Sequence, residues 1–339
     1  LVKNYFDQDG FPLTRNPTDL IFFVKYLVLC KKCIKDAQQY APEFLDIIIQ
    51  KNFKCIKNIL TPNNQIPLFN GGKENNLEDF TKIFDGFDNK SKDKKNIIGG
   101  IHTFTNKNNA LFFEAGEPPK KSFSRSYQSG PLSFEYYLDG KKIITNCGFG
   151  SNISPKAELL SRLTSAQSTL TLNDTSVTRF ERNKLINKVF GNSIKNTFRV
   201  NNFDFVENKN QIKFIASHNG YEKKFGCIHT RELSVDKLDG KLKGFDEIKK
   251  RKDGKPLNYN LRFHLYPGLT AVKTMSGNSV LIQINKNKSL IFTIKDELIL
   301  LEKSIFLGGN KILDNTCITI SGNLVNKDKA IHWELTKSI

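Results

Sequence analysis

The stretch that decides the fold is residues 132–145, LSFEYYLDGKKIIT. Two short runs with a period of two flank Asp139-Gly140, a dipeptide that favours a tight two-residue turn between antiparallel strands. We therefore predict a hairpin in which the strand ending at Tyr137 pairs with the strand starting at Lys142.

Similar short segments, separated by Gly, Asn and Asp, continue almost to the end of the chain. They lie at residues 110–114, 168–172, 211–215, 259–265, 280–284, 289–294, 316–320 and 331–335. So many short strands predict two packed antiparallel sheets.

The pattern before residue 90 is different. Apolar residues between Thr18 and Leu60 recur at spacings of three and four, which predicts two amphipathic helices. Pro17 suits a helix start and Pro42 a break. Two helices with one apolar stripe each cannot enclose a core, so we expect them to end a larger helical array that begins before Leu1.

We therefore predict two parts. Residues 1–90 hold the last helices of an incomplete array and a linker, and residues 91–339 hold a large β-sandwich. The boundary falls in the Lys-, Asp- and Asn-rich run at residues 88–96, which is typical of a solvated linker.

Composition excludes several classes of protein. The chain has 339 residues, 38% of them hydrophobic, with a mean hydropathy of −0.41, which is typical of a folded globular protein. No stretch approaches the roughly 20 apolar residues of a membrane-spanning helix. The first residue is Leu1 and the single methionine is Met275, so we expect the true N-terminus to be missing.

The net charge of +18 is unevenly distributed, with +1 in residues 1–90 and +17 in residues 91–339. This charge permits a polyanionic partner, although 43 Lys, 9 Arg and 35 Asn also fit the drift of an AT-rich genome. No basic helix, zinc-finger spacing or RNP-like motif favours nucleic acid. An acidic polysaccharide is the better candidate.

The six cysteines are scattered apart from Cys30-Lys-Lys-Cys33, whose spacing occurs in redox and zinc pairs. No second pair accompanies it. Both cysteines fall at i, i+3 in an apolar helical run, so we predict that they are small core residues. The sequence also lacks a Gly-x-Ser-x-Gly elbow, a Walker loop, His-Glu-x-x-His and a Rossmann glycine fingerprint.

The order of several segments resembles the C-terminal portion of heparinase II/III-like proteins. The matching segments are residues 9–17, 132–135, 140–148, 166–174, 217–221, 229–231 and 262–268. The resemblance implies the end of an (α/α) toroid followed by an antiparallel β-sandwich, hence an α+β multidomain protein.

The resemblance also implies a polysaccharide lyase that cleaves a uronate-containing glycan by β-elimination. A base removes the proton at C5, a neutral His or Asn or a metal quenches the carboxylate charge, and an acid protonates the leaving oxygen. In this family the cleft lies between toroid and sandwich. We expect part of the site to precede Leu1.

Several positions depart from the family pattern. A family His-x-His-x-Asp aligns with Ser126, Gln128 and Gly130, a family Asp with Asn146, and a family His with Gln167. Gln and Asn are poor zinc ligands, so we predict no tightly bound zinc and no cofactor. Where the family has a Tyr after the dipeptide that matches Asn16-Pro17, this chain has Asp19.

The remaining site residues are predicted from these segments. His218, Tyr221 and His264 are candidate catalytic residues. His218 and Tyr221 flank a glycine turn, where both could face a cleft or simply close the turn. His264 faces away from its strand neighbours Phe263 and Leu265, toward a cleft or the outer face of the sheet.

The candidate substrate-binding residues share a hydrogen-bonding or charged side chain suited to a uronate. They are Arg231, His229, Gln128, Asn146, Gln167 and Asn16. A planar guanidinium such as that of Arg231 can bind both oxygens of a carboxylate, although Arg231 also fits a solvated strand position.

Two functions remain open. One is a lyase acting on an acidic glycan. The other is a non-catalytic carbohydrate-binding or envelope polysaccharide-assembly protein on the same scaffold, which the missing His and Asp residues favour. The resemblance places the protein in the periplasm or cell envelope, whereas six cysteines without evident partners suit a reducing compartment. The glycan and the oligomeric state are left open.

Overall fold

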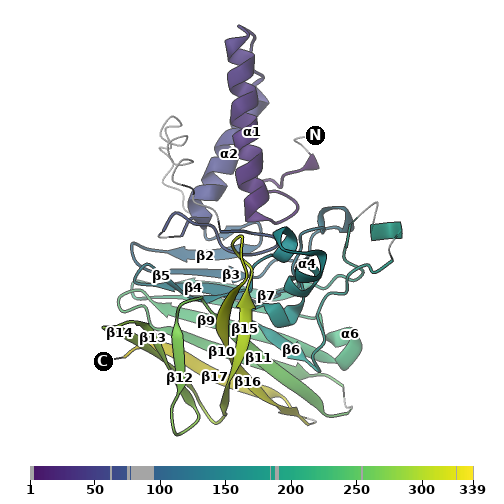
Figure 1. The fold of residues 1–339 in the computed structure, drawn as a ribbon. Coiled ribbons are helices and arrows are strands. Elements are labelled where there is room, and N and C mark those ends of the chain that lie inside the picture. The colour runs from purple at the N-terminus through teal and green to yellow at the C-terminus, as the bar shows by residue number, and fades with distance from the viewer. Residues whose placement is uncertain are drawn as a thin grey trace.

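The structure is a computed structural model that describes residues 4–61, 63–74, 77, 95–183, 185–187, 191–252, 255–325 and 327–338. Two helices near the N-terminus stand on the outer face of one sheet of a two-sheet sandwich (Figure 1). The predicted boundary near residue 90 lies outside the described residues.

Both predicted helices are present. They are α1 (Pro17–Asp36) and α2 (Glu43–Ile59). Asn16 caps α1 because its side-chain oxygen accepts a hydrogen bond from the Thr18 N–H, and Pro17 occupies the first helical position. Five short helical segments lie between strands. Two are α-helices, α4 (Pro155–Ser161) and α6 (Glu222–Phe225), and three are 3₁₀ turns, η2 (Lys121–Phe123), η3 (Gly150–Asn152) and η4 (Thr164–Ala166).

The strands form two antiparallel sheets. The first has the order β1-β2-β3-β4-β5-β11-β16-β15, with β6 also paired to β11, and the second has the order β12-β13-β14-β17-β10-β9-β8-β7. The first sheet contains β1 (Ile97–Ile98), β2 (Ile101–Thr105), β3 (Ala110–Glu114), β4 (Phe134–Leu138), β5 (Lys141–Thr145), β6 (Leu170–Leu172), β11 (Leu257–Leu265), β15 (Ile299–Phe306) and β16 (Leu313–Leu324). The second contains β7 (Val200–Glu207), β8 (Gln211–His218), β9 (Cys227–Asp236), β10 (Leu242–Lys250), β12 (Thr270–Lys273), β13 (Ser279–Asn285), β14 (Lys288–Ile294) and β17 (Lys329–Lys337). The prediction of two packed antiparallel sheets is confirmed.

The predicted hairpin joins β4 to β5. Asp139 and Gly140 both have positive φ, 49° and 73°, and Leu138 pairs with Lys141. Positive φ at both central residues is the requirement of a type I′ turn, which matches the right-handed twist of the flanking strands.

The main core lies between the two sheets. Phe134 and Phe263 of the first sheet meet Phe292 and Trp333 of the second, and the Trp333 ring stacks on Phe134 and Phe292 at centroid distances of 5.6 and 5.7 Å. This interlocking of aromatic side chains fixes how the sheets face each other.

A second core joins the helices to the outer face of the first sheet. Leu20 and Phe53 of the helices share it with Ile101, Phe112 and Tyr137 of the strands. The two helices therefore pack directly on the sandwich rather than forming a separate body.

One prediction about the helices is wrong. Cys30 and Cys33 are exposed on α1, not buried in a core. The buried face of α1 is formed by Pro17, Leu20, Ile21 and Val24, all in its first half. Among the described residues, no helix combines the length and apolar character required to cross a lipid bilayer.

Candidate functional site

The junction between the helices and the sandwich holds the first predicted binding residue. The Asn16 amide nitrogen lies 3.2 Å from Asp19 Oδ1 and 3.5 Å from Ser126 Oγ, so Asn16 joins α1 to the loop before β4. Burial raises the pKa of Asp19, which accepts a hydrogen bond from Thr14. Asn16 itself is buried, and its side chain is used for capping and packing.

Gln128, Asn146 and Gln167 come together below this junction, and all three are buried. The amide nitrogens of Gln128 and Gln167 both donate to the Ser161 carbonyl, each at 2.8 Å. Asn146 Oδ1 accepts from the Ser168 N–H. Positions far apart in the sequence are thus brought together. The amide nitrogens of Gln128 and Gln167 bond to the protein itself, whereas Asn146 Nδ2 is buried without a hydrogen-bond partner among the described residues.

These residues do not fit a zinc ion. Gln128 Oε1 already accepts a hydrogen bond from the Gly71 N–H, Gly130 has no side chain, and amides are weak zinc ligands. In the part of the chain that the structure describes, no three His, Cys, Asp or Glu residues are grouped so that they could hold a metal. We therefore assign no metal-dependent step to this chain.

His218, His229 and Arg231 lie in a different place, inside the sandwich. Together with Asp246 and Trp333 they form what we call the interior cluster. Asp246 accepts hydrogen bonds from Arg231 Nε at 2.7 Å, His229 Nε2 at 2.7 Å and Trp333 Nε1 at 2.8 Å.

Arg231 also reaches across to the other sheet. Its Nη1 donates to the main-chain carbonyls of Leu132 and Ser168, at 2.7 and 2.8 Å. Its guanidinium lies over the Phe134 ring, 5.3 Å from the centroid. Arg231 is fully buried and each of its three side-chain nitrogens has an acceptor, so it holds the two sheets together and does not face a cleft.

The placement of His218 and Tyr221 at a cleft is also wrong. The two side chains are each 1% exposed. Tyr221 donates to the Leu170 carbonyl at 2.9 Å, and His218 Nδ1 accepts from the Gly220 N–H at 3.1 Å. The His218 bond closes the turn locally, as the simpler of the two predicted interpretations expected. The Tyr221 hydroxyl instead bonds carbonyls 51 and 46 residues away, so it ties the turn to β6 and the loop after it.

The pKa values in the interior cluster are set by burial and by the charges of its own residues. Burial lowers the pKa of His218 well below its usual value, and the nearby His229 and Arg231 lower it further. Burial opposes ionisation of Asp246, but Arg231 and His229 outweigh it and bring the pKa of Asp246 to about 2. The cluster therefore contains a charged Arg–Asp pair and neutral histidines.

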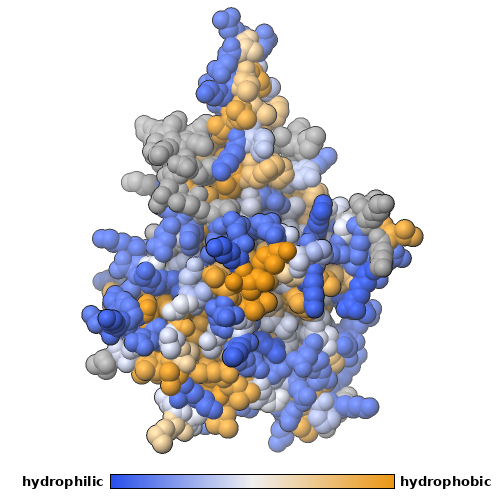
Figure 2. Space-filling model, viewed as in Figure 1, coloured by the Kyte–Doolittle hydropathy of each residue, from blue (hydrophilic) through white to orange (hydrophobic). Residues whose placement is uncertain are grey.

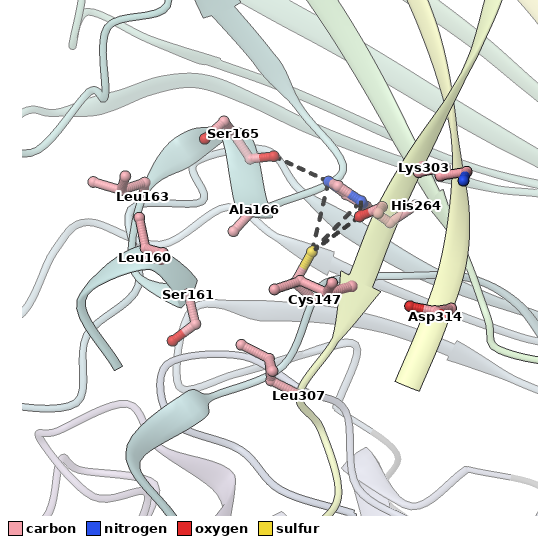
Figure 3. Close-up of a pocket in the computed structure, with 12 residues that line it drawn as sticks. Cys147, Leu160, Ser161, Leu163, Ser165, Ala166, His264, Lys303, Leu307 and Asp314 are labelled. Atoms are coloured by element: carbon pink, nitrogen blue, oxygen red, sulfur yellow. Dashed lines mark hydrogen bonds between the residues drawn. The ribbon is translucent and has the colours of Figure 1, made fainter. Parts of the chain in front are cut away.

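His264 differs from the other predicted catalytic residues because it lines a cavity. The cavity has a volume of about 380 Å³ and lies between α4, η4 and β15 (Figure 3). Leu160, Leu163, Ile305 and Leu307 form apolar walls. Figure 2 shows an apolar patch on the surface here, to which Leu160 and Ile305 contribute.

The His264 ring has a partner on every side. Its Nε2 lies 3.1 Å from the Ser165 carbonyl, and its Nδ1 lies 3.0 Å from Ser304 Oγ and 3.5 Å from Cys147 Sγ. The two predicted alternatives are therefore compatible, because the ring lies on the outer side of the sheet and lines the cavity there.

A second, more polar cavity adjoins the first. Its volume is about 620 Å³, and the two cavities share Leu160, Leu163 and Ser165 as lining residues. Arg179, Arg182 and Lys195 supply positive charge to it. All three cations are exposed, and Lys195 pairs with Glu181 at 3.0 Å.

Sequence reasoning missed these cations. Two of the chain's nine arginines fall within residues 179–182, and this local density was a usable signal. Cys147 and Ser304 were also missed as partners of His264, because they lie 117 and 40 residues away in the chain.

The comparisons with known proteins agree with this architecture. The model of the heparinase II/III-like C-terminal family matches residues 93–334. The chain belongs to the heparinase II/III-like family. A search of curated protein sequences finds no significant match.

Solved structures of heparinases share the fold. The heparan sulfate lyase HepC from Pedobacter heparinus matches with a TM-score of 0.77 at 14% identity, over 99% of this chain and 54% of that one. A heparinase III matches with a TM-score of 0.76 at 14% identity, over 99% of this chain and 55% of that one. The present heparinase II/III-like chain thus spans about half the length of these structures.

Proposed function

We propose that this chain is part of a polysaccharide lyase that cleaves an acidic, uronate-containing glycan by β-elimination in the periplasm or cell envelope. The observation that carries the proposal is membership of the heparinase II/III-like family across residues 93–334. The fold shared with heparan sulfate lyase HepC supports it.

In this proposal the chain supplies binding surface for the glycan. The cavity with Arg179, Arg182 and Lys195 offers two planar guanidiniums that can each hold a carboxylate through two hydrogen bonds. Among the described residues that line it, Asp174 is the acidic one, so the field there favours an anion.

The residues predicted to transfer protons are engaged within this chain. His218 and Tyr221 are enclosed, and the His264 ring is engaged by Ser165, Ser304 and Cys147. We place the C5 base and the acid for the leaving oxygen on parts of the lyase outside this chain, with an (α/α) toroid extending α1 and α2.

One observation favours the alternative, a non-catalytic carbohydrate-binding or polysaccharide-assembly protein. Gln128, Asn146 and Gln167 stand where the family has ionisable residues. The amide nitrogens of Gln128 and Gln167 and Asn146 Oδ1 are engaged in internal hydrogen bonds. Such substitution is expected where binding is kept and catalysis is lost.

The test is the absorbance of unsaturated uronate, measured for the full-length protein against heparan-type, chondroitin-type, alginate and capsular glycans. A rising signal on one of them supports the lyase. Arg179→Gln with Arg182→Gln should then raise KM about tenfold with little change in kcat, from the loss of about 1.4 kcal/mol of ground-state binding.

The matched control is Lys209→Gln with Lys286→Gln, which removes the same charge from exposed positions outside the cavity. If KM is unchanged in this control, the rise in KM of the arginine variant is due to lost contacts in the cavity and not to the lower net charge. No signal on any glycan, together with measurable binding of one, would establish the non-catalytic alternative.

A further inference from the structure

Cys147 and His264 form a pair that the proposed glycan chemistry does not use. The imidazole Nδ1 lies 3.5 Å from Cys147 Sγ, within the range of a sulfur hydrogen bond. The two side chains point toward each other at the cavity between α4 and β15 (Figure 3). A nucleophile, a base beside it and an adjoining cavity are the parts of a reactive thiol site.

The hydrogen bonds fix which imidazole nitrogen is the base. The Ser165 carbonyl can only accept, so Nε2 carries a proton and donates to it at 3.1 Å. In the neutral ring Nδ1 is then the acceptor. Ser304 Oγ lies 3.0 Å from it, and Cys147 Sγ lies 3.5 Å from Nδ1 and 3.9 Å from Nε2, so the thiol is within reach of Nδ1 beside the ring. Ser165 thereby holds the ring in the tautomer and orientation that can take the thiol proton.

The protonated ring is also accommodated. Nδ1–H can donate to Cys147 Sγ or to Ser304 Oγ, which lies 3.0 Å away, and the Ser304 hydroxyl lies 3.8 Å from the sulfur. Burial on its own opposes charge on His264, yet its pKa is raised because Cys147 and the Ser165 carbonyl favour the charged form.

The other charged groups around the pair are few. Lys303 and Asp314 line the cavity, from β15 and β16, and Arg262 on β11 opposes protonation of the ring. Lys303 and Asp314 have opposite charges, so their effects on the pair partly cancel.

Hydrogen bonds fix the main chain of both residues. The Cys147 N–H donates to the Ala166 carbonyl, and the Cys147 carbonyl accepts from the Leu307 N–H. His264 is anchored within β11, where its N–H donates to Ser168 Oγ. These contacts fix the backbone positions from which the two side chains extend toward each other.

We propose that Cys147 and His264 form a thiol–imidazole dyad that makes this cavity a site of covalent modification by small, uncharged, soft electrophiles. The apolar walls select an uncharged molecule, and a volume of about 380 Å³ limits its size. This inference does not depend on the lyase proposal.

The reaction with iodoacetamide illustrates the step. The thiol proton moves to His264 Nδ1, and the sulfur attacks the carbon that bears iodine. A C–S bond forms as the C–I bond breaks, and iodide leaves with the bonding electrons. The imidazolium then returns its proton to solvent.

The test is alkylation of the full-length native protein by iodoacetamide at pH 6 and pH 8, with each cysteine followed by peptide mass mapping. An ordinary thiol of pKa about 8.5 slows by about 80-fold between these pH values. The exposed Cys30 and Cys33 are followed in the same digests as references. For Cys147 we expect a fall of less than about tenfold, because its base is already in place.

Variants identify the partner. His264→Gln should give Cys147 the steep pH dependence of an ordinary thiol, whereas Ser304→Ala should leave the shallow dependence in place. Cys317 reports on folding: it is buried, burial raises its pKa to about 11, and it should stay unmodified in every folded variant.

The inference is overturned if Cys147 slows in parallel with Cys30 and Cys33, if His264→Gln folds and leaves its pH dependence unchanged, or if Cys147 reacts only after unfolding. If His264→Gln does not fold, the inference is still tested by the ratio of the Cys147 alkylation rates at pH 8 and pH 6 in the protein without substitutions.

Discussion

Asp246 is the residue on which the donors of the interior cluster converge. Its two oxygens accept from Arg231, His229 and Trp333, which lie on β9 and β17, the strands on either side of its own strand β10. A fully buried ion pair of this kind brings modest net stability, but the removal of one partner leaves an uncompensated charge in the core.

Asp246→Ala should therefore lower the free energy of unfolding by about 3–5 kcal/mol. Urea denaturation followed by Trp333 fluorescence measures the change. The control is Glu232→Gln, which breaks the partly exposed Lys213–Glu232 pair next to Arg231 on β9 and should cost less than about 1 kcal/mol. Equal effects of the two substitutions would contradict the proposed importance of the interior cluster.

His218 and His229 make stability depend on pH. Burial lowers the pKa of both below the value of about 6.5 that they have in the unfolded chain. Below pH 6.5 the unfolded state therefore binds protons that the folded state does not, and stability falls as pH falls.

The expected slope is up to about 1.4 kcal/mol per pH unit for each histidine, beginning near pH 6.5 and continuing down to the folded-state pKa. Urea midpoints at pH 7.5, 6.5 and 5.5 measure it. His218→Asn should flatten the slope, and His332→Asn, at an exposed position, should not.

The same residues show what the sequence could reveal about the site. His229 and Arg231 were predicted as substrate-binding residues, and their alternation with the apolar Leu233 and Val235 was not followed. All four point inward. The interior face of a strand usually carries apolar residues, and here it carries His and Arg. That these two side chains point inward could be predicted only if their buried partner Asp246 were known.

At the level of elements, strands with a clear alternation of apolar residues were predicted, among them the segments near β3, β4, β5 and β11. The segment of β10 was missed. In β10, Asp246 and Gly244 occupy inward positions between Leu242 and Ile248. Hydrophobic periodicity does not predict such a strand, because these inward positions lack apolar side chains. Asp246 is instead stabilised there by its hydrogen bonds, and the space beside Gly244 is occupied by the Trp333 ring.

Gly244 illustrates this replacement. A Cβ at this position would lie 2.0 Å from the Trp333 ring, which packs directly on the glycine. Gly244→Ala should displace Trp333 from Phe134 and Phe292 and cost about 3 kcal/mol or more. Thermal unfolding and the near-UV signal of the single tryptophan measure the loss.

Gly140→Ala is the matched comparison. The nearest atom to its Cβ would be 3.7 Å away, so the cost is limited to the strain of a positive φ, about 1–2 kcal/mol. If both alanine variants lost the same stability, the crowding at Trp333 would not be the cause.

At the level of the whole molecule, helices and sandwich are joined by a shared core and a buried ion pair. Arg15 precedes α1 and binds Glu114 at the end of β3, and Asn70 donates to the second Glu114 oxygen at 3.1 Å. Burial raises the pKa of Glu114, an effect that Arg15 opposes. The family resemblance led to a helical part and a sandwich in this order, but pairing between residues 99 positions apart left no local signal.

This joint should make helices and sandwich unfold together. The single tryptophan, Trp333, reports on the sandwich core, and far-UV circular dichroism reports chiefly on α1 and α2. In the unmodified chain the two signals should change at the same urea concentration, because the second core contains side chains from both parts. Glu114→Ala leaves the Arg15 guanidinium buried without its anion, at a cost of about 3–5 kcal/mol.

The lost Arg15–Glu114 pair lies at the contact between the helices and the sandwich. In Glu114→Ala the far-UV signal of the helices should therefore be lost at a lower urea concentration than the Trp333 signal. Glu117→Ala is the control. It lies three residues further on, and Arg15 bonds only its main-chain carbonyl, at 2.6 Å, so both signals should stay together. Coincident transitions in Glu114→Ala would show instead that the apolar contacts of Leu20, Phe53 and Phe112 alone couple the helices to the sheet.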